Sequence, residues 1–181
     1  MLARTLLIAL DATLTILCHA NRMPAYIRPR IPGATIFFTV ALRERGGDTL
    51  VREVDRLRAA VGVTRAERPF HIDAWVVLPD HLHAVWTLPE GDADFPTRWR
   101  LIKTRFSRGL PAGPRRASDM ARGERAIWQR RFWEHHVRSA EDRAALIRYC
   151  HINPVKHGLA ETPEEWPYSS VHRERRAGRW A

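Results

Sequence analysis

The chain has 181 residues, a length that suits one domain with a single hydrophobic core. Apolar residues make up 45% of the sequence, which excludes disorder of the whole chain. The formal net charge of +10 predicts a polyanionic partner and favours nucleic acid over an anionic membrane.

The cysteine count and the N-terminus give two further expectations. Only Cys18 and Cys150 occur, which excludes a disulfide scaffold and agrees with a reducing cytoplasm. Asp11 interrupts the apolar run of residues 2–18, so we expect no membrane span. The run has the outline of a signal peptide, but Met23 is an alternative start, which we favour. Residues 1–22 are then an extension, and residues 23–181 form a single domain.

The first half of the chain predicts three strands and one helix. Residues 33–42 are rich in β-branched and aromatic residues, as in a buried strand. Helical spacing of apolar residues begins at Asp48, and Gly62 is expected to end this helix. Residues 70–78 and 81–88 predict a hairpin around the turn Pro79-Asp80.

The second half adds two helices and a strand. Residues 99–110 predict a basic amphipathic helix, residues 111–125 a flexible loop, and residues 128–137 a fourth strand. A helix is expected from about residue 140 to residue 157, capped by Ser139 and ended by Gly158. Pro154 is expected to kink it and to set Lys156 and His157 apart from the turn of Tyr149. The tail from residue 159 is polar.

This order of elements predicts an α+β fold. The first six elements match a ferredoxin-like βαββαβ unit, in which helices pack on an antiparallel sheet. The last helix is an addition to that unit.

Two histidines form the sharpest local feature of the sequence. His81 and His83 begin a predicted strand, and residues two apart on a strand point to the same side. Both imidazoles can therefore reach one metal ion. A chance His-x-His among nine histidines is the competing interpretation.

The predicted helix of residues 140–157 carries the second feature. Tyr149 and Asn153 are four residues apart and so lie on one helical face. If the Asn153 amide oxygen completes a metal shell, the Tyr149 phenol lies beside the ion. A phenol is a poor nucleophile unaided, and a cation that polarises a phosphodiester makes its attack feasible. A half-buried helix aromatic is the alternative interpretation of Tyr149.

The basic residues of the chain suit a nucleic-acid backbone. Basic side chains recur along residues 98–110 and could lie along the phosphates of a nucleic acid. Trp99 or Trp133 could stack on a base. Glu134 could orient a metal ligand or hold Arg138. The candidate DNA contacts are Arg98, Arg100, Lys103, Arg105, Arg108, Arg138, Lys156 and His157.

Three ordered motifs resemble the REP-associated tyrosine transposases, which belong to the single-tyrosine HUH group. They are WVVLPDHLHAVW at residues 75–86, RFWEHHVR at residues 131–138 and YCHINPVKHG at residues 149–158. The resemblance extends from about Tyr26 to about Arg173. The extension of residues 1–22 and the Arg-rich insert of residues 111–125 depart from the pattern.

The resemblance implies a metal-dependent endonuclease and strand transferase that acts on single-stranded DNA hairpins. His81 and His83 match the HUH histidines, Asn153 the third metal ligand and Tyr149 the nucleophile that forms a 5′-phosphotyrosine. The donor set suits Mg²⁺ or Mn²⁺, although imidazole would also take Zn²⁺. Whether the protein is a monomer or a homodimer stays open.

A non-catalytic module that binds single-stranded nucleic acid is the alternative function. It would not need His81, His83, Tyr149 and Asn153 together. Motifs for nucleotide hydrolysis, dinucleotide redox chemistry, zinc proteolysis and serine hydrolysis are missing from the sequence.

Overall fold

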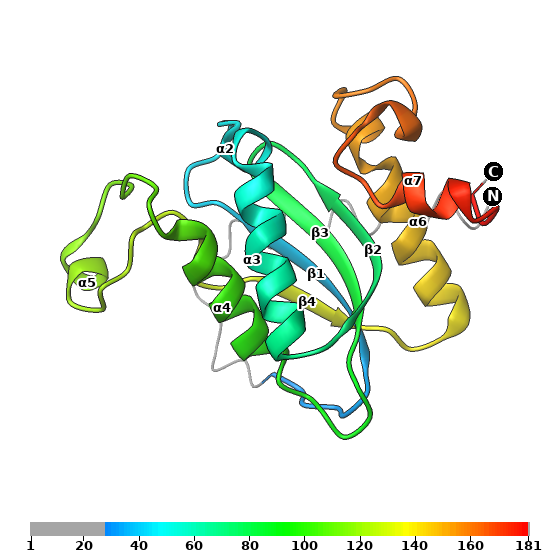
Figure 1. The fold of residues 1–181 in the computed structure, drawn as a ribbon, viewed down its shortest axis with the longest axis horizontal. Helices are drawn as coiled ribbons and strands as arrows, with labels where there is room; N and C mark the ends of the chain where they lie inside the picture. Colours follow the sequence, from blue (N-terminus) through cyan, green and yellow to red (C-terminus); the bar gives the residue numbers. More distant parts are fainter. Residues whose placement is uncertain (1–27, 181) are drawn as a thin grey trace. The chain divides into compact units, whose positions relative to one another are not determined.

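A four-stranded antiparallel sheet is the centre of the computed structural model, which describes residues 28–180 (Figure 1). Residues 31–180 belong to one structural unit. The predictions for residues 1–22 and for Tyr26 lie outside the described residues. The strands are β1 (Thr35–Ala41), β2 (His71–Val77), β3 (His81–Thr87) and β4 (Trp133–His136).

The strand order β2-β3-β1-β4 confirms the ferredoxin-like topology. β1 lies between β3 and β4, and it pairs antiparallel with both. The helices α3 (Val54–Glu67) and α4 (Phe95–Ser107) cover one face of the sheet, and α6 (Ala140–Lys156) packs against β2 and β3 from the other (Figure 1). The expected additional helix is therefore α6.

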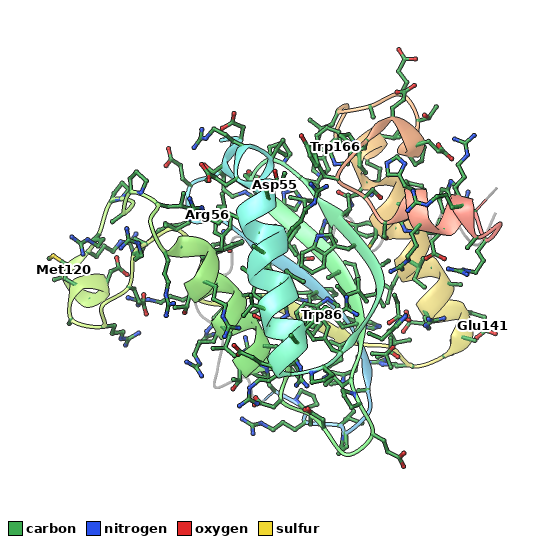
Figure 2. The ribbon with its side chains drawn as sticks, viewed as in Figure 1. Asp55, Arg56, Trp86, Met120, Glu141 and Trp166 are labelled. Atoms are coloured by element: carbon green, nitrogen blue, oxygen red, sulfur yellow. The ribbon has the colours of Figure 1, made fainter. Side chains whose placement is uncertain are left out.

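Alternation along the strands divides the buried side chains between the two faces. Phe38 and Trp86 belong to the core beneath α3 and α4, where Figure 2 shows Trp86. Phe37, the neighbour of Phe38, faces the other way and contacts the rings of His83 and Tyr149. The face toward α6 thus combines apolar packing with chemically active groups.

The helical region after β1 differs from the prediction. A short helix α2 (Thr49–Arg52) precedes α3, and α3 continues through Gly62 to Glu67. The expected end at Gly62 is wrong because this glycine has no positive φ, in contrast to glycines that end helices. Thr64 is fully buried and donates its hydroxyl to the Ala60 carbonyl, so packing extends the helix.

The segment between α4 and β4 is more ordered than predicted. It contains the short helix α5 (Ala117–Met120), whose buried Asp119 pairs with Arg43 and Arg130. Met120 lies on this loop, away from the sheet (Figure 2). The fourth strand is shorter than predicted, since Trp128 forms only an isolated bridge with Leu42.

The helix α6 begins and ends as predicted. The Ser139 hydroxyl accepts the Asp142 amide at 3.1 Å, and Gly158 has a φ of 65° just beyond the helix. Pro154 lies inside the helix, which continues to Lys156. None of the helices in the described part of the chain is long and apolar enough to cross a membrane.

The C-terminal tail covers the outer edge of β2. It forms a 3₁₀ helix (Pro163–Glu165) and α7 (Val171–Arg176). The Val77 amide donates to the Tyr168 carbonyl at 2.9 Å, and the Ser170 amide donates to the Trp75 carbonyl at 2.8 Å. An edge strand with unpaired backbone groups invites aggregation, and the tail removes that exposure. The sequence indicated only that this tail is polar.

Candidate active site

The two histidines lie together on β3. The ring centroids of His81 and His83 are 5.1 Å apart, and both side chains are buried. The intervening Leu82 points into the core on the opposite face. The expectation that both imidazoles share one side of the strand is thus confirmed.

Each histidine is oriented by a hydrogen bond at Nδ1. Asp80 Oδ1 lies 2.6 Å from His81 Nδ1, and Thr39 Oγ1 lies 2.9 Å from His83 Nδ1. Such bonds fix the tautomer and direct Nε2 toward a metal. Sequence reasoning missed both partners: Asp80 is the neighbour of His81, whereas Thr39 is brought opposite His83 only by strand pairing.

Electrostatics favour a neutral His83 and an ionised Asp80. Burial keeps the pKa of His83 well below its ordinary value, and the neighbouring His81 and His157 lower it further. A metal binds the neutral imidazole, so this suits a ligand. Burial raises the pKa of Asp80, but its bond to His81 and other interactions outweigh this and leave it below the usual range.

Tyr149 projects from α6 against these histidines. Its ring centroid lies 5.2 Å from that of His83 and 5.8 Å from that of Phe37. The ammonium of Lys156 lies 4.9 Å from the centre of the Tyr149 ring. The predicted separation of Lys156 from this turn is therefore wrong: the helix continues through Pro154, and residues seven apart share a face.

Asn153 carries an amide that the fold leaves unsatisfied. Its side chain is 1% exposed, and neither Oδ1 nor Nδ2 has a hydrogen-bond partner among the described residues. Buried polar groups almost always have a partner, so an exception indicates a function or an additional ligand. One helical turn separates Asn153 from Tyr149.

The donor set of this site fits a divalent metal. In the described part of the chain, no three His, Cys, Asp or Glu side chains cluster as a metal site. The predicted set, however, is two imidazoles and one amide oxygen. The orphaned amide of Asn153 and the Nδ1 bonds of His81 and His83 are what such a set requires.

His157 is a further neighbour of the site. Its ring centroid lies 5.2 Å from that of His81, and the side chain is exposed. His157 therefore lies beside the histidines, just beyond the last residue of α6. Its position suits the phosphate contact suggested by the sequence.

The basic helix α4 lies on the other face of the sheet, and several of its side chains have partners within the protein. Lys103 Nζ donates to the Gln129 carbonyl at 2.8 Å, and Arg105 bonds to Thr64 and Glu67. Arg98 is 1% exposed and pairs with Asp92. The expectation that Arg98 contacts DNA is wrong, whereas Arg100 and Arg108 are exposed.

Arg98→Ala should lower the free energy of unfolding by about 3 kcal/mol, because it removes a buried guanidinium and leaves its hydrogen-bond partners unpaired. Arg98 also donates to the carbonyls of Arg68, Pro69 and Asp94. Arg100→Ala, on the same helix but exposed, should change stability by less than about 0.5 kcal/mol. Urea denaturation of both variants measures the difference, and equal stabilities would contradict the structural role of Arg98.

The remaining predicted contacts divide between the two faces. Trp99 is fully buried in the core, so it cannot stack on a base, whereas Trp133 is partly exposed and contacts Phe37 edge-on. Glu134 pairs with Phe38 in register and so lies on the face away from the histidines; it does not orient them. Arg138 and Lys156 are exposed at the two ends of α6.

A ferredoxin-like sheet that places two histidines of one strand against a tyrosine of a helix has the architecture expected of single-tyrosine HUH transposases. The chain is 45% identical over 152 residues to the REP-associated tyrosine transposase of Escherichia coli K12, covering 84% of this chain and 85% of the relative. A Haemophilus influenzae protein, provisionally described in the same way, is 40% identical over 157 residues, or 86% and 89% of the two chains.

A solved structure of a REP-associated tyrosine transposase bound to a REP hairpin agrees with these similarities. It superposes with a TM-score of 0.77 at 44% identity, covering 88% of this chain and 89% of the other. No protein-family model matches the sequence. The chain belongs to the family of REP-associated tyrosine transposases.

Proposed function

We propose that this protein cuts and rejoins single-stranded DNA beside hairpins, with Tyr149 as the nucleophile. The observation that carries the proposal is the position of the Tyr149 ring, 5.2 Å from that of His83 and one helical turn from the unsatisfied amide of Asn153. A non-catalytic nucleic-acid binding module would gain nothing from this arrangement.

In the proposed reaction, the Tyr149 oxygen attacks the scissile phosphorus and loses its proton. The bond from phosphorus to the 3′ oxygen breaks, the 3′ oxygen takes up a proton, and the 5′ phosphate remains on the tyrosine. Reversal by another 3′-hydroxyl rejoins the strand and releases Tyr149.

We propose that His81, His83 and Asn153 hold a Mg²⁺ or Mn²⁺ ion. When bound, the ion would withdraw negative charge from the phosphate. The protein's own residues orient the reactants: Asp80 and Thr39 fix the imidazoles, and Phe37 packs against the Tyr149 ring. The Lys156 ammonium beside that ring would attract an anionic substrate.

We propose a DNA hairpin of the REP type as the substrate. The solved relative is bound to a REP hairpin, and this chain carries a net charge of +10. A labelled hairpin with unpaired flanks is incubated with the protein, with and without Mg²⁺. The expected product is DNA linked to protein, seen as a shifted band on a denaturing gel only when the metal is present. No adduct and no cleavage under any divalent metal would contradict the proposed activity.

Salt dependence tests which basic residues bind the phosphates. Arg138→Ala and Lys156→Ala together should reduce the slope of log affinity against log salt by about 0.7 for each phosphate that the variant no longer neutralises. A single-stranded oligonucleotide is titrated at several salt concentrations. Arg100→Ala is measured in parallel, because Arg100 of α4 is also a candidate phosphate contact. An unchanged slope would show that Arg100 does not contact the DNA.

A further inference from the structure

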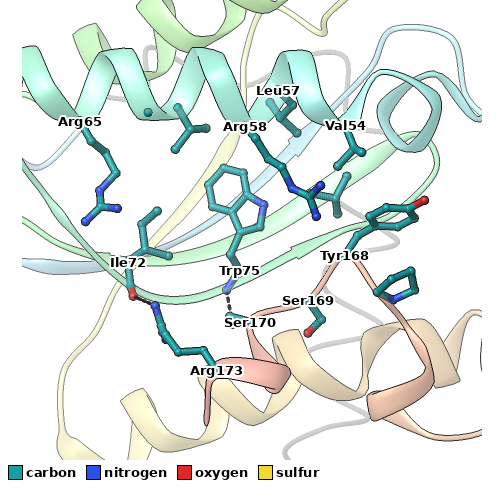
Figure 3. Close-up of a pocket in the computed structure, with 14 residues that line it drawn as sticks. Val54, Leu57, Arg58, Arg65, Ile72, Trp75, Tyr168, Ser169, Ser170 and Arg173 are labelled. Carbon is teal, nitrogen blue, oxygen red and sulfur yellow. Dashed lines mark hydrogen bonds between the residues drawn. The ribbon is translucent and has the colours of Figure 1, made fainter. Parts of the chain in front are cut away.

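The face of the sheet opposite the histidines carries a cavity. This cavity of about 370 Å³ opens between α3, β2 and the C-terminal tail (Figure 3). This volume falls within the range of about 300–1,000 Å³ that is typical of ligand sites. Trp75 projects from β2 into the middle of the cavity, and Tyr168 from the tail forms one side.

The lining combines arginines and aromatic rings with aliphatic side chains. Arg58 and Arg65 of α3 and Arg173 of α7 line the cavity, and none of the lining residues is acidic. Arg58 and Arg65 are seven residues apart, so they lie on one helical face two turns from each other. The guanidinium of Arg58 lies 6.0 Å from the centre of the Tyr168 ring, which places a cation beside an aromatic surface.

Trp75 exposes part of its aromatic ring to the cavity. Trp86 and Trp99 are fully buried and stack with their centroids 4.3 Å apart. Trp75 is nearly parallel to both, with an interplanar angle of 6° to Trp86, and it is only partly buried. Trp75 is thus the cavity-side member of an aromatic cluster that the core holds rigid.

Arg173 and Ser170 fix the wall of the cavity. Arg173 donates to the carbonyls of Ile72 and Asp73, at 3.0 and 2.7 Å. These bonds attach α7 to the backbone of β2. Ser170 Oγ accepts the Trp75 amide at 2.9 Å and lies 2.9 Å from His151 Nε2 of α6. These bonds hold the cavity in shape before any ligand arrives, which lowers the entropy cost of binding.

We propose that this cavity binds an unpaired nucleotide of the DNA that flanks the hairpin. The base would stack against Tyr168 and Trp75, and its phosphates would meet Arg58 and Arg65. Stacking platforms combined with arginines are the general solution for single-stranded nucleic acid. The proposal rests on the proposed function, because it takes its ligand from the same substrate, but it concerns recognition on the far side of the sheet from Tyr149.

The test compares two DNA probes on the full-length protein carrying Tyr149→Phe, without divalent metal, so that only binding is measured. One probe is a fluorescent hairpin with unpaired flanks, and the other is the same hairpin with blunt ends. Tyr168→Leu, which keeps an apolar side chain, should weaken binding of the flanked hairpin about tenfold and leave the blunt one unchanged.

Arg58→Ala should likewise weaken only the flanked hairpin. Arg52→Ala is the matched control, since Arg52 and Arg58 are about equally exposed and each pairs with a nearby aspartate, but Arg52 does not line the cavity. Thermal unfolding monitors the fold of every variant. In addition, 5-iodouracil in the flank should cross-link on irradiation to Trp75 or Tyr168, as mapped by mass spectrometry.

Equal loss of both probes, no loss with either variant, or cross-links confined to the face of Tyr149 would overturn the proposal. Binding of free deoxynucleoside monophosphate that depends on Tyr168, with flanked-hairpin binding unaffected, would assign the cavity to a free nucleotide and also overturn it. Failure of the proposed function has a different signature: the wild type would bind the flanked hairpin in a Tyr168-dependent way but form no adduct with metal present.

Discussion

Tyr149→Phe should abolish the protein–DNA adduct and strand cleavage while preserving the fold and DNA binding. The substitution removes one hydroxyl and keeps the ring that packs against Phe37 and His83. Loss of the attacking oxygen removes the covalent route, which we expect to lower cleavage by at least about a thousandfold. The measurement is adduct formation on a labelled hairpin with Mg²⁺, alongside a binding titration without metal.

Tyr168→Phe is the matched control for this experiment. It also loses a phenolic hydroxyl, but Tyr168 lies in the tail at the far face of the sheet. Because phenylalanine keeps the aromatic ring on which a flanking base would stack, this control should form the adduct at the normal rate when the hairpin is saturated with protein. Adduct formation by Tyr149→Phe, or peptide mapping that places the DNA on Tyr168 or Tyr26, would contradict the role of Tyr149 and with it the proposed mechanism.

Asn153→Leu should separate stability from activity. The Asn153 amide is buried without a hydrogen-bond partner among the described residues, and leaving such a group unpaired costs about 1–3 kcal/mol. Leucine has a similar volume, no polar atom and a higher helix propensity. The free energy of unfolding in the absence of metal should therefore rise by about that amount, while metal-dependent cleavage should be abolished.

Two measurements on Asn153→Leu check this expectation. Urea denaturation in EDTA gives the stability, and thermal unfolding with excess Mg²⁺ or Mn²⁺ reports metal binding. Because a ligand that binds only the folded state raises Tm, the wild type should gain Tm with the metal and the variant should gain less. His83→Ala provides the comparison: it should also lose cleavage, but without a gain in stability. A variant that is less stable and still cleaves would assign Asn153 to the structure alone.

Local patterns sufficed for most elements. The strands β1 and β3 could be predicted because each is a short run rich in apolar residues, as expected of a strand that is buried on both faces. The ends of α6 could be predicted because the Ser139 hydroxyl caps an amide three residues away and Gly158 adopts a positive φ, and both are local effects. The errors arose where tertiary packing overrides propensity. Gly62 stays helical in an element that packs on α4 and the sheet, and α5 depends on Arg43 from a distant segment.

The same distinction applies to the candidate site. Sequence spacing predicted that His81 and His83 share a face and that Tyr149 and Asn153 share another, because strand and helix periods are local properties. Spacing also predicted that basic residues of α4 bind phosphates. It could not predict that Lys103 and Arg105 bond to Gln129 and Thr64, because these partners lie far apart in the sequence. A charge pattern shows where basic side chains lie along a helix, but not which groups they bond to in the folded protein.

The sequence by itself determined the fold class, the common face within each pair of candidate site residues and the family resemblance, since each rests on local periodicity or on ordered motifs. Only the tertiary structure decided that Tyr149 lies against His83, that Thr39 orients His83 and that the Asn153 amide is left unsatisfied. It also decided that the tail closes a basic, aromatic cavity against β2. These are contacts between residues far apart in the chain, and they are set by how the sheet, the helices and the tail pack.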